Sequence, residues 1–186
     1  MRITAGIHRG RILKVPQGDA VRPTSDKVRQ AIFNILQGYG YPADAVVLDG
    51  FCGSGALGLE ALSRGAAQAV FIEKQTDHLQ CTQDNAAGMK VADQCSFILK
   101  DVMQIGIRPV TAALAGLVFL DPPYRQNLLA PAIAALAAGA WLAPGALCVC
   151  EHEMLATPVL PSGFVLLDQR RYGDTQVSFV RYDPVR

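Results

Sequence analysis

One stretch, residues 46–62, constrains the fold of this chain more than any other. It reads VVLDGFCGSGALGLEAL: a short apolar run ends in Asp49, a glycine-rich turn follows, and apolar residues then recur at helical spacing. This pattern predicts a strand, a tight loop and a helix, the opening of a nucleotide-type βαβ unit. Gly53, Gly55 and Gly58 satisfy the G-x-G-x-x-G spacing, so the loop can pass close under a ligand. Taken alone, the loop is also compatible with a purely structural turn.

Strand-like and helix-like segments alternate through the rest of the chain. The last two predicted strands flank a Gly-Asp pair and read as an antiparallel hairpin. Because strands that alternate with helices form a parallel sheet with helices on both faces, we predict an α/β, Rossmann-like fold with a mostly parallel seven-stranded sheet and an antiparallel terminal hairpin. Beyond residues 46–62, the predicted strands are 68–73, 95–101, 117–121, 145–151, 164–172 and 175–182, and the predicted helices are 28–36, 76–87 and 127–138.

The length of 186 residues fits one domain, because it is enough to bury a single hydrophobic core. No repeat, low-complexity tract or linker divides the chain, so we predict a single domain over residues 1–186. Strand-like pieces at 2–6 and 11–15 predict a small β-hairpin, and we interpret residues 1–22 as a basic N-terminal hairpin appendage of that domain.

Composition excludes several classes of protein. A hydrophobic fraction of 51% with 18% charged residues is typical of a globular protein and not of a disordered chain. No apolar run reaches the roughly 18–20 residues that a membrane span needs, and the start of the chain lacks the apolar core of a signal peptide. The five cysteines mostly lie in apolar strands, which predicts reduced thiols and a cytoplasmic location. Cys148 and Cys150 have the wrong spacing for a zinc site, so we expect no metal.

Positive charge is concentrated at the start of the chain. Residues 1–30 hold seven arginines and lysines against two aspartates, a balance of +5, whereas the whole chain carries only +1. This asymmetry predicts either an N-terminal arm that meets an anionic partner, with nucleic acid as the leading candidate, or a solvated basic face. The arginines of this segment are Arg2, Arg9, Arg11, Arg22 and Arg29.

Acidic residues end the predicted parallel strands. They are Asp49, Glu73, Asp101, Asp121 and Glu151. Because the ligands of such sheets lie across the carboxyl ends of the strands, an acidic rim there favours a ligand with positive groups and ribose hydroxyls. S-adenosylmethionine, with its sulfonium, ammonium, ribose and adenine, fits this description.

A nicotinamide dinucleotide is the competing ligand. Glu73 lies twenty residues after Gly53, where the dinucleotide fingerprint expects its ribose acid. Against this ligand, Asp49 stands beside the place that a pyrophosphate would have to occupy, and the chain shows no catalytic His or Tyr-x-x-x-Lys pair.

The motif Asp121-Pro122-Pro123-Tyr124 ends the fourth predicted parallel strand. Two prolines fix the backbone, so that a carbonyl can point into a site instead of pairing in a sheet. Asp121 and the Pro122 carbonyl can then accept hydrogen bonds from an exocyclic amine and hold that poor nucleophile in line with a methyl group. Tyr124 offers a face on which a base can stack. We therefore expect Asp121, Pro122 and Tyr124 to be catalytic, with a plain Pro-Pro turn as the structural alternative.

These motifs together resemble the class I S-adenosylmethionine-dependent amino-methyltransferases of nucleic acids. More narrowly, the chain resembles the RsmD family, which methylates N2 of a guanine in 16S ribosomal RNA of the small subunit. The N-terminal hairpin with Arg22-Pro23-Thr24 is the specific part of this similarity, whereas many methyltransferases share the glycine loop. The matching segments are 1–6, 9–11, 22–24, 28–36, 53–66, 119–124 and 172–175.

The resemblance implies a role for each matching position. It implies direct methyl transfer to the RNA, with 16S ribosomal RNA or an assembling small subunit as the partner and no metal or membrane. The implied cofactor contacts are Asp49, Gly53, Ser54 and Gly55 at the methionine end, Glu73 at the ribose, Asp101 and Val102 at the adenine, and Thr24 in the segment that closes over the site. The implied RNA contacts are Arg2, Arg9, Arg11 and Arg22.

Two other functions stay open at this stage. An adenine-N6 methyltransferase of DNA or RNA uses the same tetrapeptide, although it usually carries a sizeable target-recognition region for which this chain has no room. A non-catalytic RNA-binding protein on the same fold is the second, and the intact motif 121–124 beside an intact glycine loop argues against it.

Overall fold

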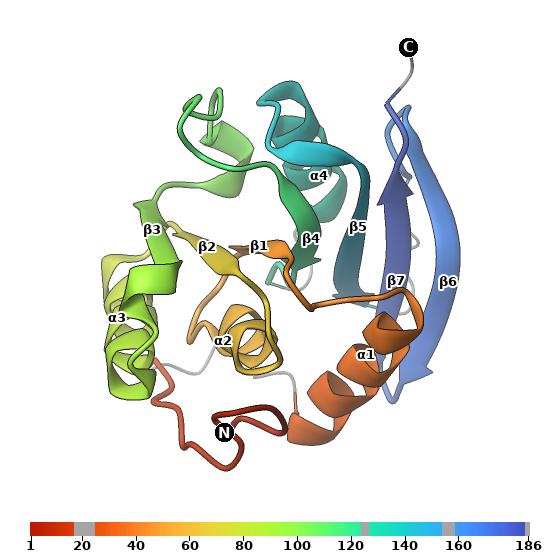
Figure 1. Ribbon diagram of the computed structural model, residues 1–186. Coiled ribbons are helices and arrows are strands. Elements are labelled where there is room, and N and C mark those ends of the chain that lie inside the picture. The colour runs from red at the N-terminus through yellow and green to blue at the C-terminus, as the bar shows by residue number, and fades with distance from the viewer. Residues whose placement is uncertain (17–24, 124–126, 154–158, 185–186) are drawn as a thin grey trace.

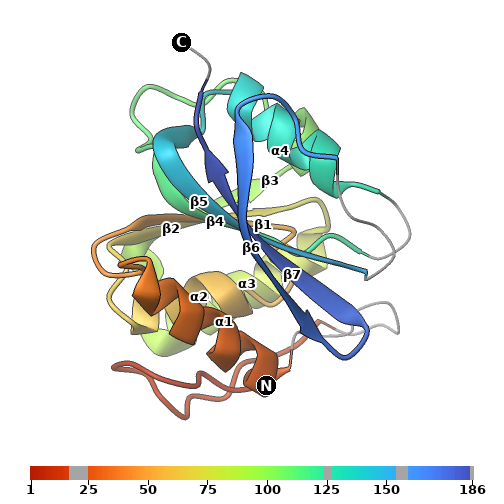
Figure 2. The same ribbon diagram turned by 90° about the vertical axis from the view of Figure 1, so that its right-hand side faces the viewer.

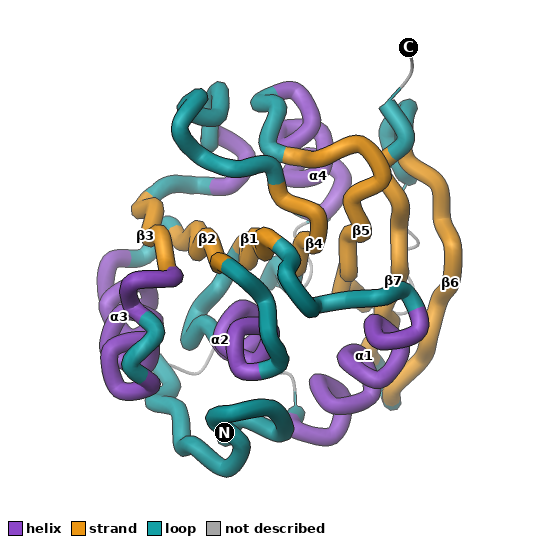
Figure 3. Tube along the Cα trace, in the orientation of Figure 1, coloured by secondary structure: helices purple, strands orange, loops and turns teal. Residues whose placement is uncertain are grey.

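The computed structural model describes residues 1–16, 25–123, 127–153 and 159–184. Its centre is a seven-stranded sheet with the strand order β3-β2-β1-β4-β5-β7-β6 (Figure 1). Figure 3 shows β7 between β5 and β6. Strands β1 to β5 pair in parallel and β7 is antiparallel to both of its neighbours, which confirms the predicted fold class. The strands are β1 (Val46–Gly50), β2 (Gln68–Glu73), β3 (Cys95–Leu99), β4 (Ala115–Leu120), β5 (Leu142–Glu153), β6 (Phe164–Tyr172) and β7 (Thr175–Tyr182).

Helices cover both faces of the sheet. The α-helices are α1 (Asp26–Gly38), α2 (Ala56–Ser63), α3 (Thr76–Met89) and α4 (Leu129–Ala138), and the 3-10 helices are η1 (Ala92–Gln94) and η2 (Val102–Gln104). Helices α1, α2 and α3 pack on one face and α4 on the other (Figure 1). Phe33, Phe71 and Phe119 fill the core beneath the first three helices, and the rings of Phe33 and Phe119 lie 5.5 Å apart. No helix among the described residues is long and apolar enough to cross a membrane.

Strands β3, β4 and β5 differ from their predicted bounds, and β4 ends at Leu120, so that Asp121 directly follows it. Strand β3 ends at Leu99, so Asp101 lies beyond it and caps η2, where its carboxylate accepts the Met103 N–H at 2.9 Å. Short acidic side chains favour such capping positions, which the apolar pattern of the strand does not reveal. Strand β5 continues to Glu153 because β7 pairs with it that far, so Glu151 lies inside the strand and not at its end.

Helix α1 buries part of the apolar face that its helical spacing predicts. Of the apolar residues at 28, 32, 35 and 36, Ile32 and Leu36 are buried, whereas Val28 and Ile35 are only partly buried. Arg29 and Phe33 are fully buried beside them. The guanidinium of Arg29 reaches Glu60 of α2, with 3.3 Å between Nε and Oε2. An opposite charge within hydrogen-bonding distance lets a cation occupy this buried position.

Residues 1–16 pack against the body of the protein. Their hairpin has a single bridge pair, Arg2 with Ile12, in place of two extended strands, and the segment runs below α1 and α2 in Figure 2. Ile3 and Leu13 belong to the core under α1 and α2. This segment is thus joined to the same core as the glycine loop.

Candidate cofactor and base-binding site

The parallel register gathers the acidic side chains on one face of the sheet. Asp49 lies level with Phe71, two residues before Glu73, and Glu151 follows Val149 by the same interval. Because side chains alternate along a strand, these three carboxylates share the face that α1, α2 and α3 cover. The carboxyl ends of β1, β2 and β5 therefore present acids to a common region.

The glycine loop between β1 and α2 needs its glycines. Gly53 and Gly55 have φ angles of +54° and +74°, in the left-handed region that favours glycine. A Cβ at Gly55 would stand 2.6 Å from a carbon of Thr82, and one at Gly58 would stand 2.4 Å from the ring of Phe71. The loop is therefore shaped for close backbone approach, both to α3 and to a ligand passing over it.

Asp49 lies beneath this loop, and no cation in the part of the chain that the structure describes forms an ion pair with it. Its side chain is 2% exposed, and Oδ2 accepts the Gly58 N–H at 2.9 Å. Burial raises the pKa of Asp49 to about 8, the Gly58 hydrogen bond opposes that rise, and the nearby Glu73 carboxylate adds to it. A cation bound next to Asp49 would favour its ionised form. The ammonium group of a methionine moiety is such a cation.

Glu73 is held firmly at the end of β2. Its carboxylate accepts three backbone N–H groups, from Gly53 at 3.1 Å, Lys74 at 2.8 Å and Gln75 at 3.1 Å. Nδ1 of His78 lies 3.9 Å from the same carboxylate. Since an ionised carboxylate has about four acceptor positions, Glu73 can still accept from a ligand hydroxyl.

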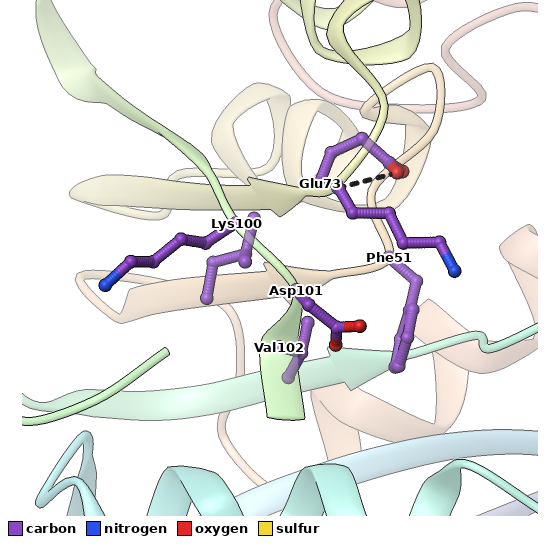
Figure 4. Close-up of a pocket in the computed structure, with 7 residues that line it drawn as sticks. Phe51, Glu73, Lys100, Asp101 and Val102 are labelled. Atoms are coloured by element: carbon purple, nitrogen blue, oxygen red, sulfur yellow. Dashed lines mark hydrogen bonds between the residues drawn. The ribbon is translucent and has the colours of Figure 1, made fainter. Parts of the chain in front are cut away.

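A pocket opens beside Glu73 and is lined by Phe51, Ile72, Glu73, Lys74, Lys100, Asp101 and Val102 (Figure 4). It brings together the predicted ribose acid and the two predicted adenine contacts, Asp101 and Val102. Phe51 is a lining residue that the sequence reasoning missed. Its φ of +62° is strained for an aromatic residue. The sequence feature that could have indicated Phe51 is an aromatic side chain between β1 and the first glycine of the loop. Apolar faces from Phe51, Ile72 and Val102 with two carboxylates match the chemistry of adenosine.

The other predicted site residues are placed as follows. Asp121 directly follows β4 and is half-buried, and Pro122 after it is buried. The side chain of Ser54 is buried, and its hydroxyl faces the Met1 sulfur at 3.6 Å. Arg2, Arg9 and Arg11 are exposed on the N-terminal segment. Tyr124, Arg22 and Thr24 lie outside the described residues. Within the described ranges, no group of three or more His, Cys, Asp or Glu residues could hold a metal ion.

Comparison with known proteins adds an independent finding. The family described as Conserved hypothetical protein 95 matches residues 1–181. The "Ribosomal RNA small subunit methyltransferase D" of Escherichia coli is 39% identical over 183 residues, which cover 98% of this chain and 89% of that protein.

Solved structures give the same picture of the fold. The Escherichia coli protein yhhF superposes with a TM-score of 0.84 at 36% identity, over 98% of each chain. An RNA methyltransferase of Salinibacter ruber, solved in complex with S-adenosyl-L-homocysteine, superposes with a TM-score of 0.67 over 88% of this chain and 95% of that one. At 19% identity the second likeness concerns the fold alone.

Proposed function

Because the chain belongs to the RsmD family, described as Conserved hypothetical protein 95, we propose that it transfers a methyl group from S-adenosylmethionine to N2 of a guanine in 16S ribosomal RNA. The Escherichia coli relative is named for methylation of small-subunit ribosomal RNA, and its similarity extends over almost all of this chain. We propose free 16S RNA or an assembling small subunit as the substrate and the cytoplasm as the place of the reaction.

The cofactor would lie over the carboxyl ends of β1, β2 and β3. The loop 53–55 and the negative charge of Asp49 would hold its methionine end, and Glu73 would accept from the ribose hydroxyls. Asp101 and Val102, with Phe51 opposite, would hold the adenine in the pocket of Figure 4. When bound, the cofactor supplies an electrophilic methyl group on a sulfonium sulfur.

The target guanine would lie at the carboxyl end of β4. Asp121 and the Pro122 carbonyl would accept the two N2 hydrogens, and Tyr124 would stack on the base. These bonds position N2 in line with the methyl carbon. The cofactor would supply the methyl group to N2 as its sulfur–carbon bond breaks, and Asp121 or water would take the N2 proton. None of these steps requires a covalent enzyme intermediate. A guanine that starts paired or stacked must first be splayed out, at a cost of about a few kcal/mol.

The basic N-terminal segment would bind the RNA backbone. Arg9 and Arg11 are exposed near its turn, and Arg2 is exposed beside the start of α1. Phosphate contacts of this kind set orientation and not sequence, so the choice of base is left to the site itself. Arg22 and Thr24 would close over the bound cofactor and base.

The observation that carries this proposal is a complete Asp121–Tyr124 motif directly after β4, the strand that pairs with the cofactor strand β1. The test is tritium transfer from labelled S-adenosylmethionine to small subunits from cells that lack this protein, followed by nucleoside analysis. Label in N2-methylguanosine is expected. Label in N6-methyladenosine would overturn the choice of base, and no label in subunits or in free RNA would overturn the proposal.

An Asp121→Ala variant separates an enzyme from a binding protein. We expect it to lose turnover while it keeps most of its RNA affinity, because Asp121 contacts one amine of a large RNA. The matched control is Asp183→Ala, an exposed acid whose partner is Arg181, and it should transfer label at the wild-type rate.

A further inference from the structure

Asn85 of α3 joins two parts of the protein to which the proposed function gives different ligands. Its side chain is 5% exposed. The amide oxygen accepts the Lys14 backbone N–H at 2.8 Å, and the amide nitrogen donates to the Lys14 carbonyl at 3.0 Å and to the Ser54 carbonyl at 2.9 Å. One side chain therefore holds the backbone of the N-terminal segment and the backbone of the glycine loop.

The neighbouring residues of α3 make simpler contacts. One turn earlier, the Thr82 hydroxyl donates to the Gly53 carbonyl at 2.8 Å, so it holds the loop but not the N-terminal segment. Asp84 pairs with the Lys14 ammonium at 2.8 Å on the surface, so it contacts the segment but not the loop. Among these three residues of one helix, Asn85 alone bonds both parts.

The N-terminal segment is also anchored to Glu60. A movement of the chain between the two anchors would therefore be transmitted to Asn85. Glu60 accepts the backbone N–H groups of Thr4 and Ala5 at 2.8 and 3.0 Å. The exposed Arg9 and Arg11 lie between this anchor and Lys14. Ser63 of α2 also accepts the backbone N–H groups of Ile7 and His8, at 2.8 and 3.0 Å. RNA bound at those arginines therefore acts on a stretch of chain that is fixed to α2 on one side and, through Asn85, to the cofactor loop on the other.

We propose that Asn85 is a positioning residue that couples RNA binding at the N-terminal segment to cofactor binding at the loop 53–55. This inference rests on the proposed function, since it takes the two ligands to be RNA and S-adenosylmethionine. The coupling is reciprocal: each ligand tightens the other by the same factor, because both favour the same arrangement of Lys14 and Ser54 about the Asn85 amide.

The test measures that factor directly. The dissociation constant of S-adenosylhomocysteine is determined by calorimetry with and without saturating unmethylated small subunits, and that of the subunits with and without saturating S-adenosylhomocysteine. In the wild-type protein we expect each ligand to tighten the other about fivefold or more. In Asn85→Ala the factor falls to near one. The isosteric Asn85→Asp loses at least one of the two donated bonds without leaving a cavity and should behave in the same direction.

Two control variants separate coupling from damage to the fold. Thr82→Val should weaken S-adenosylhomocysteine binding but keep the wild-type coupling factor, and Asp84→Ala should change neither. Thermal unfolding of each variant shows that the comparison is made on folded protein. Coupling that survives in both Asn85 variants, or that is missing from a wild-type protein that transfers methyl groups, overturns this inference alone. A wild-type protein that neither binds S-adenosylhomocysteine nor transfers label overturns the proposed function instead.

Discussion

Two buried carboxylates, Glu60 within α2 and Asp49 of β1 beneath that helix, have opposite surroundings. Glu60 accepts hydrogen bonds from the Thr4 N–H, the Thr4 hydroxyl, the Ala5 N–H, and the guanidinium groups of Arg29 and Arg64. Asp49 accepts the backbone N–H of Gly58, and its pKa is raised to about 8. Glu60 is thus supplied with two cations from within the protein, whereas no cation among the described residues forms an ion pair with the buried Asp49.

The difference agrees with a structural role for Glu60 and with the proposed ligand-binding role of Asp49. Glu60 joins the N-terminal segment, α1 and α2 around one charge, and its bonds are complete without any other molecule. Asp49 lies beneath the glycine loop, where a bound cation would pair with its carboxylate. Strained electrostatics of this kind is a recognised mark of a binding site.

The largest effect is expected from breaking the Glu60 cluster. Glu60→Gln removes the buried charge that pairs with both Arg29 and Arg64, although Arg29 keeps its ion pair with Asp26 at 2.8 Å. Removal of one partner from a buried ion pair costs about 3–5 kcal/mol. Urea unfolding followed by circular dichroism measures this loss. A change close to zero would mean that the cluster contributes nothing to folding and would remove the contrast with Asp49.

Asp49→Asn should have two opposite effects. We expect cofactor affinity to fall about tenfold to hundredfold, the usual worth of a hydrogen bond to a charged group. The cofactor-free variant should nevertheless be more stable than wild type at pH 8. Because the folded pKa of Asp49 lies above the ordinary 3.8, the folded state binds its proton more tightly, and stability is lost as the pH rises from about 4 towards 8. Thermal unfolding of the variant and the wild type at pH 5 and pH 8 checks this. An equal difference in stability between the two proteins at both pH values would contradict it.

The pH dependence of cofactor binding also tests the difference between Asp49 and Glu60. With a pKa of about 8 in the free protein, Asp49 must lose a proton before it can pair with a cation. The affinity for S-adenosylhomocysteine should therefore increase between pH 5.5 and 7.5 in the wild-type protein, as calorimetry can measure. Asp49→Asn should give a nearly flat profile over that range, and a parallel increase in both proteins would point to another group.

The smallest effect is expected from an exposed ion pair. Lys14 and Asp84 lie 2.8 Å apart but both are well exposed, so solvent and side-chain entropy offset most of their attraction. Asp84→Ala should leave the urea midpoint unchanged within error. A loss comparable with that of Glu60→Gln would show that burial is not what makes the Glu60 cluster strong.

The sequence predicted the β1–α2 region better than the Glu60 cluster, for a physical reason. A strand, a glycine turn and a helix follow one another within residues 46–62, so local pattern is enough to recognise them. The Glu60 cluster depends on residues of α1, α2 and the N-terminal segment that are distant in the chain. Helical spacing identifies the apolar residues of α1, but an apolar pattern cannot show that Arg29 is buried or which distant acid meets its guanidinium.

The site was predicted in part for the same reason. Glu73 ends β2, and Asp101 and Val102 lie shortly after β3, so the local apolar pattern places them near the ends of neighbouring strands, and the structure brings them to one pocket. Phe51 was missed because its contribution depends on a positive φ that carries its ring to the pocket, and backbone conformation at a bulky residue is not evident from its type. The bridging role of Asn85 was missed because its partners, Lys14 and Ser54, lie on two other segments.

The most direct test of the contrast is an NMR titration of the Asp49 carboxyl carbon in protein labelled with carbon-13 at aspartate, assigned by comparison with Asp49→Asn. The account predicts that this carbon titrates near pH 8 in the free protein and becomes ionised at pH 6.5 when S-adenosylhomocysteine is added. An Asp49 that is already ionised at pH 6.5 in the free protein, or that stays protonated with the ligand bound, would contradict it.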